Sequence, residues 1–139
     1  MTVPRLGETL PARRFGPIDA AWVGRYADAS LDRNPIHRDA AAAQAAGFPG
    51  PILPGMLLLG LCERVLRQWR PDLPIAHLSG RFLAPLIAPA DVEVSGRVAL
   101  VEPDAVPPRA VLRLFVRPVG GTAPACVAEA WLRLSAGAA

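Results

Sequence analysis

The longest apolar segment of the chain begins near residue 55 and ends before Pro71. Its apolar side chains recur with helical spacing at Met56, Leu57, Leu58, Leu59, Leu61, Cys62, Val65, Leu66 and Trp69. They surround the segment at its start and leave a polar face only after Glu63. This pattern is typical of a helix whose first half is buried on every side. We therefore expect the rest of the chain to wrap around a central helix over about residues 55–70.

Beyond this helix the hydrophobic pattern changes to alternation, which is typical of β-strands. Four such segments follow, over residues 75–83, 92–101, 110–116 and 125–134. Consecutive antiparallel strands after one buried helix favour an α+β fold in which an antiparallel sheet wraps around the helix. The chain has 139 residues without an internal repeat or a low-complexity linker, so we expect one domain over residues 1–139.

The first third of the chain alternates extended and helical patterns. Residues 1–12 form an extended lead-in, which could be an edge strand, and residues 13–18 have strand character. Asp19 is a suitable N-cap for a short helix over residues 20–27. Asp39 is placed in the same way before the alanine-rich segment 40–46. A loop rich in proline and glycine then leads to the central helix.

Arginine supplies all fifteen basic residues, against twelve acidic ones, which gives a net charge of +3. Arg13-Arg14 is the only adjacent basic pair, and no stripe of basic and aromatic residues appears, so nucleic acid is a poor candidate partner. The guanidinium group suits phosphate. An anionic carrier such as coenzyme A, or an acidic carrier protein, fits this balance. A plain scatter of surface arginines fits it equally well.

Two further features of the sequence bear on the cellular location of the protein and on metal binding. The N-terminus does not resemble a signal peptide, and no apolar run approaches the ~18 residues of a membrane span. We therefore expect a cytoplasmic protein with no membrane partner. Cys62 and Cys126 lie far apart without the spacing of metal ligands. We expect two reduced, buried thiols and no metal site.

The segment from Asp32 to His37 is the strongest candidate for chemistry. It places a carboxylate and an imidazole five residues apart, and Pro35 stiffens the turn between them. General acid–base catalysis requires both groups to be held within reach of one reacting atom. The same run is also an ordinary turn sequence. Taken alone, the pair predicts a site only weakly.

Three sequence blocks together carry a family resemblance. The run Asp32-Arg33-Asn34-Pro35-Ile36-His37 resembles the D-x-N-P-[IL]-H signature of the MaoC-like, (R)-specific enoyl-CoA hydratases. Residues 48–57 resemble the block that opens the central helix of this hotdog-fold family, and residues 80–91 resemble its R-F-x-x-P-x-x-x-G-D block. The blocks occur in family order over most of the chain. The resemblance implies a single hotdog domain that forms a homodimer, in which pantetheine runs between the subunits.

The resemblance also assigns roles to particular residues. Asp32 and His37 match the catalytic positions, and Gly55 matches the oxyanion contact. Gly55 lies at the start of the predicted central helix, where unpaired N–H groups and the positive end of the helix dipole favour an oxyanion. The alternative is that Gly55 only permits a tight junction between loop and helix. We also expect Asn34, inside the first motif, and Met56, beside Gly55, to bind substrate.

Two positions depart from the family pattern. Pro54 stands where most members have histidine, so one side chain near the thioester is lost, although proline suits the start of a helix. Leu31 stands where many members have glycine. Three further residues are weaker candidates. We interpret Phe82 as sheet packing, Arg38 as a solvated side chain that could meet a phosphate, and Glu63 as the polar face of the central helix.

The expected activity is hydration of trans-2-enoyl thioesters to (R)-3-hydroxyacyl thioesters, or the reverse dehydration. The Asp32–His37 pair would act on one water, with a backbone oxyanion hole at Gly55. We expect no cofactor beyond the coenzyme A or phosphopantetheine arm that carries the substrate. Two alternatives stay open. One is a hotdog acyl-CoA thioesterase, and the other is a non-catalytic protein that binds acyl thioesters.

Overall fold

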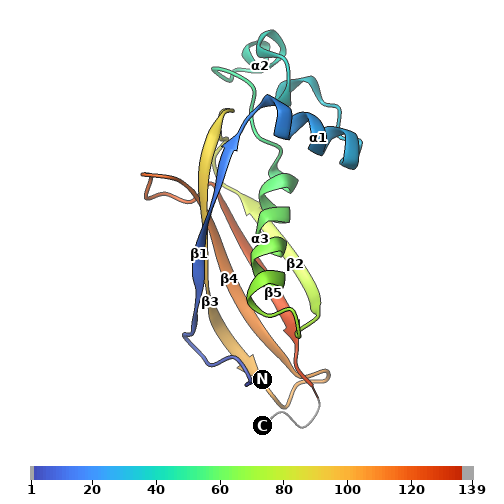
Figure 1. Cartoon of the computed structure of the whole chain (residues 1–139), viewed down its shortest axis with the longest axis vertical. Helices are drawn as coiled ribbons and strands as arrows, with labels where there is room; N and C mark the ends of the chain where they lie inside the picture. Colours follow the sequence, from blue (N-terminus) through green and yellow to red (C-terminus); the bar gives the residue numbers. More distant parts are fainter. Residues whose placement is uncertain (1, 136–139) are drawn as a thin grey trace.

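The computed structural model describes residues 2–135 and contains a five-stranded antiparallel sheet with a long helix against it (Figure 1). In chain order the elements are β1 (Thr9–Ile18), α1 (Ala20–Ser30), the 3₁₀ helix η1 (Pro35–His37), α2 (Ala40–Ala45), α3 (Gly55–Trp69), β2 (Ile75–Phe82), β3 (Ala90–Glu102), β4 (Arg109–Pro118) and β5 (Cys126–Arg133). The strands lie in the order β1-β3-β4-β5-β2, and all neighbours are antiparallel.

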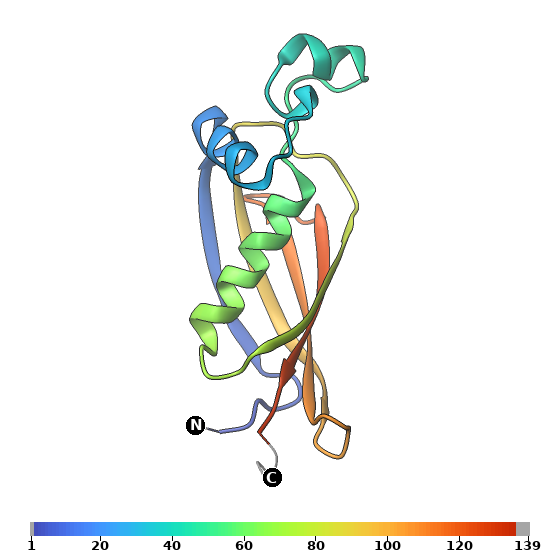
Figure 2. The same ribbon diagram turned by 90° about the vertical axis from the view of Figure 1, so that its right-hand side faces the viewer.

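Helix α3 lies along the concave side of the sheet (Figures 1 and 2). The residues that it buries are Leu57, Leu58, Leu59, Leu61, Cys62, Val65 and Leu66. Alternate residues of the strands face it, and on β4 these include the fully buried Leu112 and Leu114. Removal of this apolar surface from water is the main force that holds the sheet around the helix. The predicted central helix and the sheet wrapped around it are confirmed.

Residues 9–12, the end of the predicted lead-in, join residues 13–18 in one long edge strand, β1. β1 pairs with β3 along the edge of the sheet, and its register shifts between Leu10 and Arg13, around Pro11. Proline cannot donate to a ladder, and therefore a sheet tolerates it only at an edge or a bulge. The break in pattern at Pro11 is thus a bulge within β1. The sheet accordingly has five strands, and the first of them extends the strand character predicted for residues 13–18 back to Thr9.

Side-chain caps begin both short α-helices as predicted. The Asp19 carboxylate accepts a hydrogen bond from the Trp22 N–H at 3.0 Å, and the Asp39 carboxylate accepts one from the Ala41 N–H at 2.9 Å. Such caps satisfy N–H groups that have no partner within the helix. Helices α1 and α2 lie at the end of the sheet where α3 begins (Figure 1). The short elements are thereby gathered around the N-terminus of the central helix.

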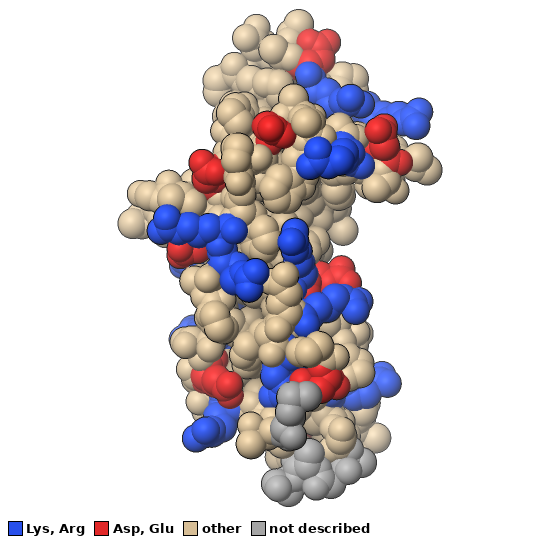
Figure 3. Space-filling view, viewed as in Figure 1, with Lys and Arg blue, Asp and Glu red and all other residues tan. Residues whose placement is uncertain are grey.

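The two thiols and the surface charges agree with the composition. Cys62 and Cys126 are buried and free, and burial raises the pKa of the Cys62 thiol to about 12. On the face shown in Figure 3, arginines are scattered and acidic side chains lie beside several of them, without one continuous basic surface. None of the helices in the described part of the chain is both long and apolar enough to cross a membrane.

Candidate active site

Asp32 and His37 lie side by side, although His37 ends η1 and Asp32 belongs to the loop that precedes it. The Asp32 Oδ2 atom is 3.5 Å from His37 Nε2, and the two side chains are 41% and 11% exposed. His37 Nδ1 lies 2.8 Å from the Ile52 carbonyl oxygen. Because a carbonyl oxygen only accepts hydrogen bonds, Nδ1 carries the proton, and Nε2 of the neutral ring keeps its lone pair. The free lone pair therefore lies 3.5 Å from the carboxylate oxygen, so that one water molecule beside the two atoms can form a hydrogen bond to each.

A chain of hydrogen bonds between residues two apart in the sequence builds this turn. Ser30 Oγ accepts from the Asp32 N–H at 3.1 Å, and Asp32 Oδ1 accepts from the Asn34 N–H at 3.3 Å. Asn34 Oδ1 in turn accepts from the Ile36 N–H at 3.3 Å and caps η1. These are the local side-chain to backbone bonds that Ser, Asp and Asn favour in turns. One Asp32 oxygen is thus fixed to the backbone, and the other faces His37.

Leu31 occupies a conformation that explains why glycine is common at this position in the family. It ends α1 with φ 62° and ψ 15°, in the left-handed region, and is 72% exposed. A side chain in this region costs roughly 1 kcal/mol or more relative to glycine. The left-handed residue reverses the chain direction directly before Asp32. The turn therefore holds Asp32 and His37 in place at some cost in stability.

Gly55 begins α3, where backbone N–H groups have no partner within the helix. Pro54 is the N-cap residue and makes no side-chain capping bond. A Cβ atom at position 55 would lie 2.8 Å from the Phe82 ring. Packing against Phe82 therefore requires glycine here, which adds a structural reason to the functional one. Both readings of Gly55 are compatible with this geometry.

A cavity of about 270 Å³ joins His37 to the start of α3. Its lining residues are His37, Phe48, Ile52, Leu53, Gly55, Leu58, Phe82, Leu83, Ala84, Pro85, Leu86 and Ala125. Apart from the imidazole, every one of these side chains is uncharged and nearly all are apolar. His37 and Gly55, which lie in different sequence blocks, thus share one wall of a mostly apolar cavity.

The remaining predicted site residues lie outside this lining. Asp32 reaches the site through its contact with His37. The Asn34 side chain is exposed and engaged in capping η1. Met56 is on the exposed side of α3, 58% accessible. Substrate binding by Asn34 and Met56 therefore stays a prediction.

Phe82 is the site residue that the sequence interpretation missed. It ends β2, opposite Cys126 in the register, and its ring lies against Gly55 and lines the cavity. The R-F-x-x-P block contained the signal, because it places an aromatic residue where β2 leaves the sheet.

Glu63 forms an ion pair with Arg67 at 2.8 Å, which agrees with its predicted place on the polar face of α3.

A second cavity, of about 290 Å³, lies on another side of His37. Its lining is Asp19, Ala20, His37, Arg38, Pro51, Ala88 and Pro89. A backbone hydrogen bond from the Ala88 N–H to the Pro51 carbonyl oxygen at 2.8 Å ties two of its walls together. Arg38, predicted as a solvated side chain, is exposed but also lines this cavity. His37 is thus the residue that the two cavities share.

A sheet wrapped around one helix, with a carboxylate and an imidazole beside the N-terminus of that helix, defines a hotdog-fold hydratase or dehydratase. The family model of the MaoC-like domain matches residues 2–102, and the chain belongs to this family. It is 33% identical over 125 residues to the (R)-specific enoyl-CoA hydratase of Aeromonas caviae, and the match covers 88% of this chain and 89% of that protein.

Solved structures agree with this assignment. The (R)-hydratase from A. caviae involved in PHA biosynthesis superposes with a TM-score of 0.83 at 30% identity, over 94% of this chain and 97% of that chain. A chain of the ChsH1-ChsH2 complex from Mycobacterium tuberculosis superposes with a TM-score of 0.82 at 25% identity, over 97% of this chain and 100% of that one. The predicted hotdog fold and enzyme class are therefore confirmed.

Proposed function

We propose that this enzyme adds water to trans-2-enoyl thioesters to give (R)-3-hydroxyacyl thioesters, or catalyses the reverse dehydration. The observation that carries the proposal is the orientation of His37. Its Nδ1–H donates to the Ile52 carbonyl, and its Nε2 faces Asp32 at 3.5 Å. A fixed tautomer with a free lone pair beside a carboxylate is the arrangement that proton removal from water requires.

In the hydration direction, His37 Nε2 removes a proton from the bridging water, and the water oxygen bonds to C3 of the enoyl group. The electron pair of the double bond moves toward the thioester carbonyl and forms an enolate. The proton on His37 then passes to the Asp32 carboxylate, and Asp32 delivers it to C2. The net result is H on C2 and OH on C3, with the pair returned to its initial state.

The Gly55 N–H is the proposed donor to the enolate oxygen. It lies at the positive end of α3 and lines the same cavity as His37. One preorganised backbone donor lowers the barrier by about 3 kcal/mol in comparable sites. Pro54 leaves this donor in place, because proline is readily accepted at the start of a helix. The apolar lining of the cavity suits an acyl chain, and the thioester carrier is coenzyme A or a phosphopantetheine arm.

The assembly that we propose is a homodimer. Within residues 2–135, no strand pairs with the outer edge of β2, and such an edge is a template for a further strand. The exposed apolar residues Met56, Phe82 and Leu83 gather where β2 ends and α3 begins. A second copy paired along β2 would cover them. Sedimentation velocity tests this proposal, and Leu83→Asp is expected to shift the equilibrium toward the monomer.

A single assay with crotonyl-CoA tests the activity. Loss of the enoyl absorbance does not by itself identify the product, so the alcohol formed is analysed by chiral chromatography as its methyl ester. We expect the (R)-3-hydroxy product without release of free thiol. Thiol release would identify a thioesterase. Binding without either reaction would identify a non-catalytic acyl-thioester protein.

A further inference from the structure

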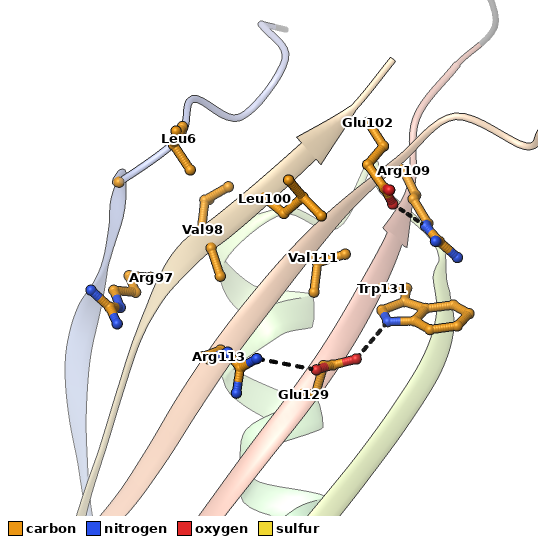
Figure 4. A pocket seen from close by; sticks show the side chains of 12 residues that line it. Leu6, Arg97, Val98, Leu100, Glu102, Arg109, Val111, Arg113, Glu129 and Trp131 are labelled. Carbon is orange, nitrogen blue, oxygen red and sulfur yellow. Dashed lines mark hydrogen bonds and ion pairs between the residues drawn. The ribbon is translucent and has the colours of Figure 1, made fainter. Parts of the chain in front are cut away.

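A groove of about 720 Å³ lies on the side of the sheet that faces away from α3 (Figure 4). It lies near the end of β3 and the start of β4, and the lead-in residues Leu6 and Gly7 form one side. This end of the sheet is remote from α1 and η1 (Figure 2). The volume falls within the ~300–1,000 Å³ usual for small-molecule sites. The acid–base pair does not use any part of this groove.

Two arginines stand directly opposite each other at one rim of the groove. Arg97 on β3 pairs in register with Arg113 on β4. Like charges directly opposite on neighbouring strands are destabilising. Arg113 approaches Glu129 at 3.8 Å, whereas Arg97 forms no ion pair with any residue in 2–135. The rim therefore offers two guanidinium groups on neighbouring strands. That of Arg113 lies toward Glu129, and that of Arg97 has no carboxylate partner within residues 2–135 (Figure 4).

The floor beside these arginines is apolar. Leu100, Val111 and Trp131 lie in one row across β3, β4 and β5, and Leu6 lies beside them (Figure 4). Leu6 is 71% exposed and Leu100 is 47% exposed, so both are available to cover an apolar ligand. The apolar part of the groove thus extends from the two arginines, Arg97 and Arg113, toward the end of β3. A ligand with an anionic head and an apolar tail matches this layout.

The charges of the lining select for a single negative charge. Three arginines and two glutamates line the groove, which leaves a net charge of +1 (3 − 2). Glu102 is paired with Arg109, and Glu129 accepts from Trp131 Nε1 at 2.9 Å. Both carboxylates would still repel a polyanion such as nucleic acid or the phosphates of coenzyme A. One carboxylate on an aliphatic chain is the best match.

We propose that this groove binds a free fatty acid. The carboxylate binds the Arg97 guanidinium, which has no carboxylate partner in residues 2–135, through charge-assisted hydrogen bonds. The aliphatic chain covers Leu6, Leu100 and Val111. The site is independent of the acid–base pair, and its occupation does not require turnover.

Dodecanoate below its micelle concentration is the probe, and isothermal titration of the full chain gives the affinity. Dodecyltrimethylammonium, which has the same chain and the opposite charge, is the matched ligand. We expect Arg97→Gln to weaken dodecanoate binding about tenfold, because one hydrogen bond to a charged group is lost. Leu100→Ser is expected to weaken it about fivefold. Arg25→Gln, on exposed α1, is the control and should leave it unchanged.

The outcomes separate this site from the active site and from a membrane surface. Support requires that both groove variants weaken binding while turnover of crotonyl-CoA stays at the wild-type rate. The proposal is overturned if dodecanoate binding is unaffected by both variants, which would place it in the cavity beside His37. It is also overturned if the cationic probe binds equally well, or if the protein binds only phosphatidylglycerol vesicles. An inactive enzyme that still shows the variant effects would refute the proposed function alone.

Discussion

Asp32 and His37 are held by a turn formed within a few residues, whereas Gly55 is held by side chains that lie far from it in the chain. The turn rests on bonds between residues two apart, such as Asp32 Oδ1 with the Asn34 N–H. The wall at Gly55 depends on the Phe82 ring at the end of β2. The comparison shows that the proposed proton-transfer pair rests on contacts within one turn, whereas the proposed oxyanion donor rests on a contact between distant segments. Substitutions in the two regions should therefore fail in different ways.

Loss of either member of the pair is expected to have the largest effect. His37→Ala and Asp32→Asn should each lower kcat/KM for crotonyl-CoA by about 10³-fold, since a positioned acid or base contributes 10²–10⁴-fold. Thermal unfolding should change little, because the turn retains its backbone bonds. Arg33→Ala, in the same turn, is the control and should remain active. Near-wild-type turnover in either variant would refute the assignment of the pair.

Gly55→Ala should disturb the cavity wall formed by Gly55 and Phe82 and leave the turn from Ser30 to His37 unchanged. The added methyl group would meet the Phe82 ring at 2.8 Å, and overpacking of this kind costs roughly 1–3 kcal/mol. We expect a lower melting temperature and a kcat reduced about tenfold or more. The double variant Gly55→Ala/Phe82→Leu separates the two effects. It should recover stability, and recovery of activity as well would show that the glycine serves packing alone.

Leu31→Gly should strengthen the turn. Glycine adopts the left-handed conformation found at φ 62° without the clash of a side chain. We expect the free energy of unfolding to rise by about 1 kcal/mol, with kcat unchanged, as measured by urea denaturation and the crotonyl-CoA assay. Leu31→Ala, which keeps a Cβ atom, is the control and should not stabilise. A destabilised glycine variant would contradict the strain assigned to Leu31.

Pro54→His is expected to have the smallest effect. It restores the residue common in the family at a position directly before Gly55. Activity should be retained, and the ratio of kcat/KM between C4 and C8 enoyl-CoA substrates should shift by about threefold, which corresponds to ~0.65 kcal/mol. An unchanged ratio would mean that position 54 acts only as the first residue before the helix.

Much of the fold could be predicted because its signals are periodic. The apolar residues of α3 and the alternation in β2 to β5 identify the helix and the four strands that follow it. β1 was recognised only in part, because Pro11 interrupts its pattern and the bulge depends on pairing with β3. The position of Phe82 over Gly55 could not be derived, since the contact joins the end of β2 to the start of α3.

The sequence by itself determined the elements whose cause is local. The turn from Ser30 to His37 follows from Ser, Asp, Asn and Pro side chains that bond or constrain the adjacent backbone, and the burial of α3 follows from its composition. Only the tertiary structure decided which segments meet. The His37 tautomer depends on the Ile52 carbonyl, and the arginine pair of the groove depends on the register of β3 with β4. The physical reason is that such contacts are fixed by packing between distant segments, which no local pattern encodes.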